Sequence, residues 1–107
     1  MTDKILVFTT AGSEAEATKI ARALVERRLA ACVNVLPKIK SLYRWKEEIE
    51  ESEEWLLVIK TTKPVFESVH DAIKELHSYE MPECISFRVD DGSLDYLKWI
   101  EASVRTD

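Results

Sequence analysis

The pattern of apolar and polar positions changes from strand-like to helix-like three times along this chain. Residues 4–10 (KILVFTT) form a run rich in β-branched and aromatic side chains, typical of a central strand buried on both faces. Ser13 and Glu16 have the spacing of a capping box, in which both side chains satisfy free backbone N–H groups. Apolar residues then recur at helical spacing, which predicts a helix to about residue 29. Its inward-facing residues are expected to be Ala17, Ile20, Ala21, Leu24 and Val25.

The middle of the chain has the pattern of a long β-hairpin. Apolar and polar residues alternate over residues 31–45, and Pro37 interrupts the run, which suggests a bulge or a sheet edge. After an acidic turn around residues 46–48, a second strand returns over residues 49–62. Its final part, residues 55–59 (WLLVI), is apolar on both faces, so we expect this strand in the middle of the sheet.

The last part of the chain completes a recognisable order of elements. Pro64 opens a helix at a position where its missing N–H is harmless. A loop over residues 79–83, a strand over residues 84–89 and a closing helix over residues 94–104 follow. The order is β-α-β-β-α-β with an extra C-terminal helix. We therefore predict one α+β domain over residues 1–107 with the ferredoxin-like plan, an antiparallel sheet with helices on one face.

The predicted hairpin is too long for one small domain to cover. A strand over residues 31–45 spans roughly 50 Å when extended, whereas a compact domain of this size is only roughly 35 Å across. The outer end carries Ile39, Tyr43 and Trp45, and an exposed apolar strand invites edge pairing. We expect these residues to contact other copies of the chain in a closed assembly. The alternative is that Pro37 folds the strand back over its own sheet.

Composition narrows the class of partners and the compartment. The formal charge is −5, from 20 acidic and 15 basic residues, and the bases are scattered among acids. This balance argues against nucleic acid and anionic membranes as partners. The chain has no apolar run of the roughly 18 residues that a membrane helix needs, and its start lacks the features of a secretory signal. We expect a cytosolic protein in which Cys32 and Cys84 stay separate thiols.

Five segments, taken together, resemble the CutA divalent-cation tolerance family. In chain order they are LAACVN (29–34), SLYRW (41–45), LVIKT (57–61), HSYEMPE (77–83) and DYLKWI (95–100). The resemblance extends over essentially the whole chain. It implies a ferredoxin-like subunit and a tight cytosolic homotrimer similar to the PII signalling proteins, with the long hairpin shared between subunits. It also implies a link to copper and other divalent cations without an established reaction.

The chain departs from the family pattern at several positions. The family usually has Gly where this chain has Glu47, and because a tight turn with positive φ favours Gly, a wider hairpin tip is expected. The copper ligands proposed for some members are a Cys in the first strand and two adjacent His residues. The matching positions here are Thr9, Leu76 and His77, so only His77 is retained.

His77 and Cys84 are the candidate ligands for copper or another divalent cation, because imidazole and thiolate suit copper. Each has a structural alternative. His77 closes the second predicted helix, where an imidazole complements the helix dipole, and Cys84 starts a strand in which a small core residue is expected. The hairpin acids could hold a hard cation or could protect an exposed edge from aggregation. These acids are Glu47, Glu48, Glu50, Glu51, Glu53 and Glu54.

No pattern in the sequence predicts an active site. The segment after the first strand, TAGS (10–13), lacks the Arg of an acylphosphatase phosphate loop, and the Met-x-Cys-x-x-Cys of a copper chaperone is missing. Paired aromatics among basic residues, expected of an RNA-binding sheet, are missing as well. We therefore predict a non-enzymatic homotrimer for divalent-metal (copper) tolerance. The alternative is a PII-like trimeric sensor that binds a small molecule in clefts between subunits.

Overall fold

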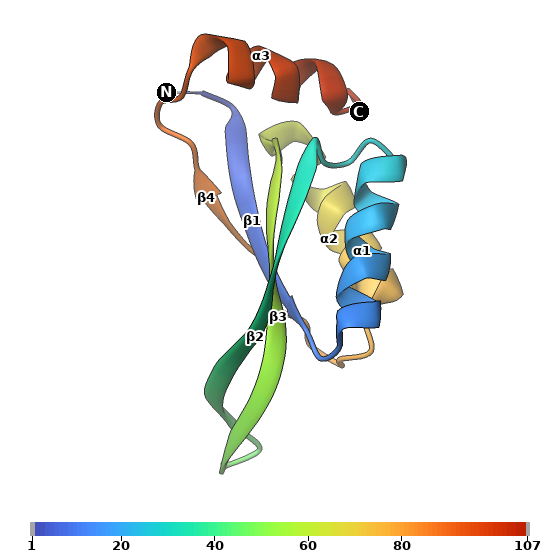
Figure 1. Ribbon diagram of the computed structural model, residues 1–107, viewed down its shortest axis with the longest axis vertical. Helices are drawn as coiled ribbons and strands as arrows, with labels where there is room; N and C mark the ends of the chain where they lie inside the picture. Colours follow the sequence, from blue (N-terminus) through green and yellow to red (C-terminus); the bar gives the residue numbers. More distant parts are fainter. Residues whose placement is uncertain (1, 107) are drawn as a thin grey trace.

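Four antiparallel strands form one sheet in the order β2-β3-β1-β4 in the computed structural model, which describes residues 2–106 (Figure 1). The strands are β1 (Lys4–Ala11), β2 (Cys32–Trp45), β3 (Glu48–Thr62) and β4 (Ile85–Arg88). β1 and β3 occupy the two central positions, as their apolar runs predicted. This position fits their composition, because an apolar run placed at the edge of the sheet would leave side chains exposed to water.

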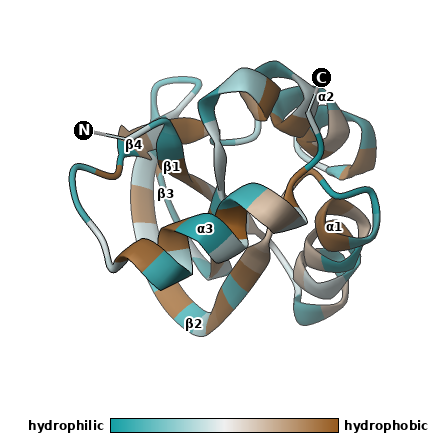
Figure 2. Cartoon of the chain, turned by 90° about the horizontal axis from the view of Figure 1, so that it is seen from above, coloured by the Kyte–Doolittle hydropathy of each residue, from teal (hydrophilic) through white to brown (hydrophobic). Residues whose placement is uncertain are grey.

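The helices lie on one face and at one end of the sheet. They are α1 (Glu14–Glu26), the 3₁₀ turn η1 (Lys63–Val65), α2 (Phe66–Leu76) and α3 (Leu94–Ser103). α1 and α2 cover the same face, and α3 crosses the end of the sheet where β1 begins (Figures 1 and 2). The predicted ferredoxin-like α+β architecture with an extra C-terminal helix is therefore confirmed. Over residues 2–106, no helix is long and apolar enough to cross a membrane.

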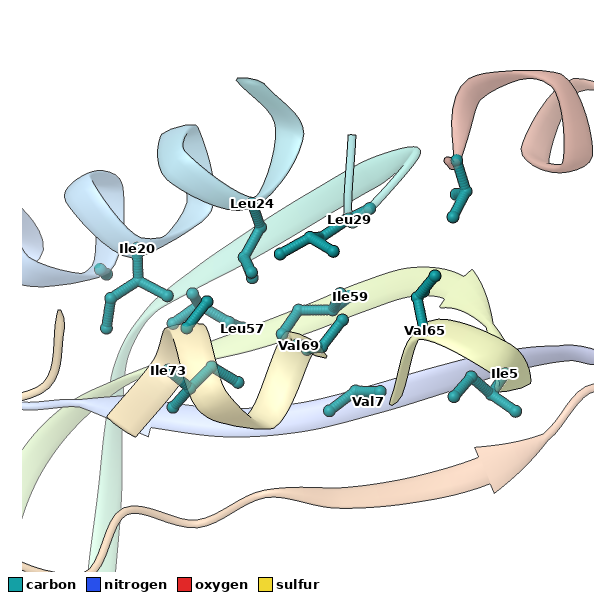
Figure 3. Close-up of a cluster of buried hydrophobic side chains, with 14 of the residues drawn as sticks. Ile5, Val7, Ile20, Leu24, Leu29, Leu57, Ile59, Val65, Val69 and Ile73 are labelled. Carbon is teal, nitrogen blue, oxygen red and sulfur yellow. The ribbon is translucent and has the colours of Figure 1, made fainter. Parts of the chain in front are cut away.

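The hydrophobic core fills the space between the sheet and these two helices. Ile20 and Leu24 of α1 and Ile73 of α2 pack near Leu57 and Ile59 of β3 (Figure 3). All of these side chains are fully buried. Burying each one contributes on the order of 1.5–3 kcal/mol of transfer free energy.

Several element ends differ from the sequence prediction. Val25, expected to face inward, is 43% exposed, because α1 reaches the core through Ala17, Ile20 and Leu24. α1 ends at Glu26 rather than near residue 29, because Arg28 takes a φ of 58° and the Leu29 N–H donates to Leu24 O at 2.9 Å. A Gly would normally mark such an end, and this chain has none there. The second helix starts as a 3₁₀ turn around Pro64. The closing helix and the fourth strand are each slightly shorter than predicted.

The β2–β3 hairpin projects beyond the core, as its length predicted. β1 pairs with β3 only from Trp55 to Thr62, so residues 48–54 have β2 as their sole neighbour in the sheet of this chain. The molecule is therefore elongated, with extents of 44 × 25 × 22 Å (Figure 1). A register shift between Leu36 and Ile39 marks the predicted bulge, and Lys38 takes a φ of 56° there. Pro37 bends the strand locally and does not fold it back over the sheet.

The hairpin tip is tight, so the expected wider tip is wrong. Trp45 pairs with Glu48, which leaves a two-residue turn of Lys46 (φ 50°) and Glu47 (φ 68°). Two positive φ values in succession define the type I′ geometry, whose twist matches that of the flanking strands. The pairing of the strands therefore imposes a backbone conformation that neither Lys nor Glu favours.

We predict that the double substitution Lys46→Asn and Glu47→Gly stabilises the protein. Asn and Gly tolerate positive φ, so the change should raise the free energy of unfolding by about 1 kcal/mol, measured by urea denaturation at constant protein concentration. The matched control is Glu48→Gly, one residue later and inside β3, which should lower stability by about 0.5–1 kcal/mol. Equal effects of both changes would contradict a strained two-residue turn.

Candidate functional site

The loop between α2 and β4 carries a buried histidine that fastens it to the sheet. His77 caps α2 by donating its backbone N–H to Ile73 O at 3.0 Å, and its side chain is fully buried. Its Nε2 lies 2.5 Å from Thr10 O, a group that only accepts, so Nε2 carries the proton and donates. Nδ1 then accepts the Tyr79 N–H at 3.1 Å. Both ring nitrogens are engaged in positioning the loop.

Glu16 of α1 binds the same loop, and Gly12 leaves room for the side chain of Tyr79 in it. Ser13 Oγ accepts the Glu16 N–H at 3.1 Å, which is one half of the predicted capping box. The other half is wrong, because the Glu16 carboxylate accepts the Ser78 N–H at 3.1 Å and so ties α1 to the loop. A Cβ on Gly12 would lie only 3.0 Å from Tyr79 Oη, so a larger residue there would push the tyrosine away.

Tyr79, which is partly buried, and the buried Glu54 form a polar pair that sequence analysis did not find. Tyr79 Oη donates to Glu54 Oε2 at 2.7 Å, and Glu54 is only 5% exposed. Glu54 is one of six similar acids along the hairpin, and the other five are exposed. Because side chains alternate along β3, Glu54 lies on the same face as Leu56. This alternation was the one feature of the sequence that could have indicated the burial of Glu54.

An open groove of about 860 Å³ lies between the outer hairpin and this loop. Tyr43 and Trp45 of β2 line it on one side, and Tyr79 and Met81 of the loop on the other. Glu54 and Glu83 are also in its lining. The groove combines aromatic walls with carboxylates, the composition of a pocket for a small molecule.

Desolvation and the charge of Glu54 together shape the titration of the groove. Burial, followed by the hydrogen bond and negative charge of Glu54, raises the pKa of Tyr79 well above its usual 10.0. Burial, followed by the charge of Glu54, also raises the pKa of Glu83 above its usual 4.5. Tyr79 therefore stays a hydrogen-bond donor across the physiological range.

Of the two candidate metal ligands, His77 has both ring nitrogens hydrogen-bonded, and Cys84 packs against the hydrophobic core. A metal ion could bind His77 only by displacing Thr10 O or the Tyr79 N–H. Burial, then the charges of Glu67 and Glu83, raises the pKa of Cys84 to about 11, which keeps it as a neutral thiol at pH 7. Glu16 Oε1 lies 3.5 Å from His77 Nδ1 without a hydrogen-bond partner among the described residues. One carboxylate oxygen beside an engaged imidazole does not fit a copper site. Across residues 2–106, no three His, Cys, Asp or Glu side chains gather closely enough to hold a metal ion.

The predicted contact residues lie together on the outer hairpin. Ile39, Tyr43 and Trp45 alternate along β2 and pair with Glu54, Glu50 and Glu48 of β3. Tyr43 and Trp45 line the groove, and Tyr43 is 41% exposed. Whether they contact another subunit remains a prediction.

A second apolar surface, the open sheet face, was not predicted. It is the side of the sheet opposite α1 and α2, where Phe8 and Phe87 pack with ring centroids 4.8 Å apart. Leu36, Ile85 and Phe87 on this face are between 42% and 48% exposed. An uncovered apolar surface of this kind commonly marks an interface.

Comparison with known proteins gives the family of the chain. The family described as CutA1 divalent ion tolerance protein matches residues 5–103. A protein named divalent-cation tolerance protein CutA from Thermus thermophilus is 44% identical over 95 residues, covering 89% of this chain and 92% of that protein. A solved structure of the divalent cation tolerance protein Cut A1 from the same organism superposes with a TM-score of 0.94 at 41% identity, covering 95% of this chain and 99% of that one. The chain therefore belongs to the CutA1 divalent ion tolerance family.

The family extends to animals, where the proteins are longer. The human protein named CutA is 45% identical over 93 residues, which cover 87% of this chain and 52% of the human protein. This chain thus spans about half the length of that relative. The names of the matched family and of these relatives refer to divalent-cation tolerance or to CutA alone and mention no reaction.

We predict that Cys84 reacts slowly with alkylating reagents because its thiol is largely protonated. In a Cys32→Ser variant, the rate of iodoacetamide modification should rise with a midpoint near pH 11 instead of the usual 9.0. At pH 8 the rate should be ~100-fold below that of the same chain unfolded in urea, since the thiolate is the reacting form. A midpoint near 9 in the folded protein would contradict the effect of burial.

Proposed function

We propose that this chain works as a non-enzymatic homotrimer in the cytosol and that it contributes to tolerance of copper and other divalent cations. Membership of the CutA1 divalent ion tolerance family supports the role in cation tolerance. The observation that carries the assembly is the large apolar surface that a single chain leaves uncovered. This surface consists of the outer hairpin and the open sheet face.

Both apolar regions contain side chains that a single chain leaves exposed. Leu42 and Ile49, near the hairpin tip, are 63% and 64% exposed, and neither has a helix of its own chain above it. β2 is also an edge strand, whose free backbone groups can pair with another chain. Closed threefold association would cover both features and would stop further growth. Such an arrangement is similar to that of the PII signalling proteins.

Metal binding through His77 and Cys84 would disturb the hydrogen bonds of the first and the packing of the second. Both residues have structural roles in the single chain, and a copper ion would have to compete with them. We therefore propose that tolerance of cations does not depend on a copper site built from this pair. His77 then acts as the buried cap of α2, the structural alternative noted from the sequence.

The alternative function is a trimeric sensor that binds a small molecule between subunits. The groove between the outer hairpin and the loop of residues 77–83 favours this function, because it combines aromatic and acidic side chains and is lined by two of the proposed contact residues, Tyr43 and Trp45. Sensing and cation tolerance are compatible, since the same assembly would serve both.

We predict a particle of about three times the 12.3 kDa chain mass in light scattering at micromolar concentration. Tyr43→Asp should shift the population toward monomers, because it places a charge in an apolar interface. The matched control is Ala15→Asp, which adds the same charge at an exposed position of α1 that belongs to neither proposed contact surface and should change nothing. A stable wild-type particle near 12 kDa would contradict the trimer.

We further predict that His77→Ala lowers stability without weakening copper binding. Loss of two hydrogen bonds from a fully buried ring should cost roughly 2–3 kcal/mol, measured by urea denaturation. Calorimetric titration with Cu²⁺ should give the same affinity as wild type. His70→Ala serves as the histidine control, since His70 is only half-buried and stacks on Phe66. Tenfold weaker Cu²⁺ binding by His77→Ala alone would instead establish His77 as a ligand.

A further inference from the structure

The outer hairpin leaves the domain at the level where β1 stops pairing with β3. Ala11, the last residue of β1, pairs with Trp55, and Glu54 is the first residue of β3 beyond that pairing. From Glu54 outward, β3 has only β2 beside it in the sheet of this chain. Residues 38–54 thus form a projecting ribbon, and contacts at the level of Glu54 decide the direction in which the ribbon points.

A bulge in β2 lies at the same level and can act as a hinge. The register of β2 against β3 shifts between Leu36 and Ile39, and Lys38 takes a φ of 56° there. Ile39 is also the partner of Glu54. A bulge interrupts the ladder and bends its strand, and short irregular segments absorb the backbone rotations of hinge motions. Because the ribbon beyond the bulge faces the open groove, it can swing about the bulge unless it is fastened to the rest of the chain.

The hydrogen bond between Tyr79 and Glu54 crosses this level and fastens the ribbon to the loop of residues 77–83. Tyr79 Oη donates to Glu54 Oε2 at 2.7 Å, and Glu54 is only 5% exposed. A hydrogen bond that is shielded from water and accepted by a carboxylate is stronger than an exposed neutral one. Breaking it would leave a buried carboxylate without its donor, so the fastened arrangement is favoured.

The loop end of this hydrogen bond is held by contacts to β1 and α1. His77 Nδ1 accepts the Tyr79 N–H at 3.1 Å, and the rings of these two residues lie with their centroids 4.6 Å apart. His77 Nε2 donates to Thr10 O of β1, and Glu16 of α1 accepts the Ser78 N–H. The hydroxyl of Tyr79 is therefore a fixed point relative to the core, to which the ribbon can be anchored.

We infer that the Tyr79–Glu54 hydrogen bond is a latch that fixes the direction of the projecting ribbon, and that breaking it lets the ribbon swing about the bulge of β2 while the core stays folded. The core is independent of the latch because its buried side chains lie between the sheet and the helices α1 and α2 (Figure 3). The latched and released states thus differ in the angle of the ribbon, with the same helices and strands in both.

The latch also prepares the chain for assembly, and this consequence rests on the proposed function. Tyr43 and Trp45, two of the proposed contact residues, belong to the ribbon. A latched ribbon presents them in one orientation, which reduces the entropy lost on association. Because the latch joins the ribbon to the loop of residues 77–83, a displacement of this loop would also move the contact residues. The latch itself is a property of the single chain and can be tested without a trimer.

The test measures the swing of the ribbon as the distribution of distances between two nitroxide labels. The labels are attached through Glu47→Cys at the hairpin tip and Lys19→Cys on α1, in a Cys32→Ser and Cys84→Ser background. Leu42→Asp is added to every variant to prevent association, because it puts a charge in the proposed interface on the ribbon face that does not carry the latch. Single chains, close to the 12.3 kDa chain mass, are isolated by size exclusion and measured by pulsed electron paramagnetic resonance at pH 7.

Tyr79→Phe removes the latch hydroxyl and keeps the ring, and it should broaden the distance distribution at least about twofold, because the hinge is then free. Glu54→Leu removes the acceptor and should have the same effect, which guards against a folding defect in either variant. Glu54→Gln keeps an acceptor for Tyr79 and should leave the distribution narrow. Tyr96→Phe is the matched control, because it removes the same hydroxyl from α3, outside the hairpin and the loop. It should leave the distribution unchanged.

The outcomes separate the latch from the proposed assembly. Distributions of equal width with and without the Tyr79 hydroxyl would overturn the inference. The link to assembly is measured by light scattering on unlabelled chains without Leu42→Asp, where Tyr79→Phe should raise the concentration of half-dissociation at least about fivefold, the effect of one lost hydrogen bond. An unchanged midpoint together with a broadened distribution removes the link to assembly alone. A narrow distribution in Tyr79→Phe beside an intact trimer removes the latch alone.

Discussion

The pairing of β1 with β3 is the constraint on which the rest of the structure depends. The eight residues of β1 pair with Trp55–Thr62, and this leaves the first half of the fifteen-residue β3 with β2 as its only neighbour. One face of the paired region receives α1 and α2 and becomes the core. The other face stays apolar without a cover, and the half of β3 that pairs only with β2 becomes part of the projecting hairpin. The projecting hairpin thus follows from the mismatch of strand lengths, and the open sheet face from the position of both helices on one side. Association of copies would cover both surfaces.

The loop between α2 and β4 forms one wall of the candidate site and is held to the rest of the fold by three contacts. His77 ties the loop to β1, Glu16 ties it to α1, and Tyr79 ties it to β3 through Glu54. Each bond is weak by itself, on the order of 1 kcal/mol, but together they hold the loop against the base of the hairpin. The cost of this arrangement is a carboxylate removed from water.

Most of the fold was predictable because its signals are local. The apolar runs at residues 4–10 and 55–59 predicted the two central strands, and Pro37 predicted the bulge. Predictions failed where one tertiary contact outweighed a local preference. Strand pairing forced positive φ on Lys46 and Glu47, the docking of α3 onto Arg28 accompanied an early end of α1, and the loop drew Glu16 away from its capping position. The Tyr79–Glu54 pair could not be predicted, because 25 residues separate the two and the hairpin offers several equivalent acids.

The sequence by itself determined the order of elements, the ferredoxin-like architecture, the excess length of the hairpin and the resemblance to the family. These properties depend on periodicity, turn residues and motif spacing, which are properties of neighbouring residues. Only the tertiary structure decided which glutamate is buried, that both nitrogens of His77 are engaged, and that aromatic and acidic side chains meet in one groove. Burial and hydrogen bonding depend on which segments meet in space, and no local pattern carries that information.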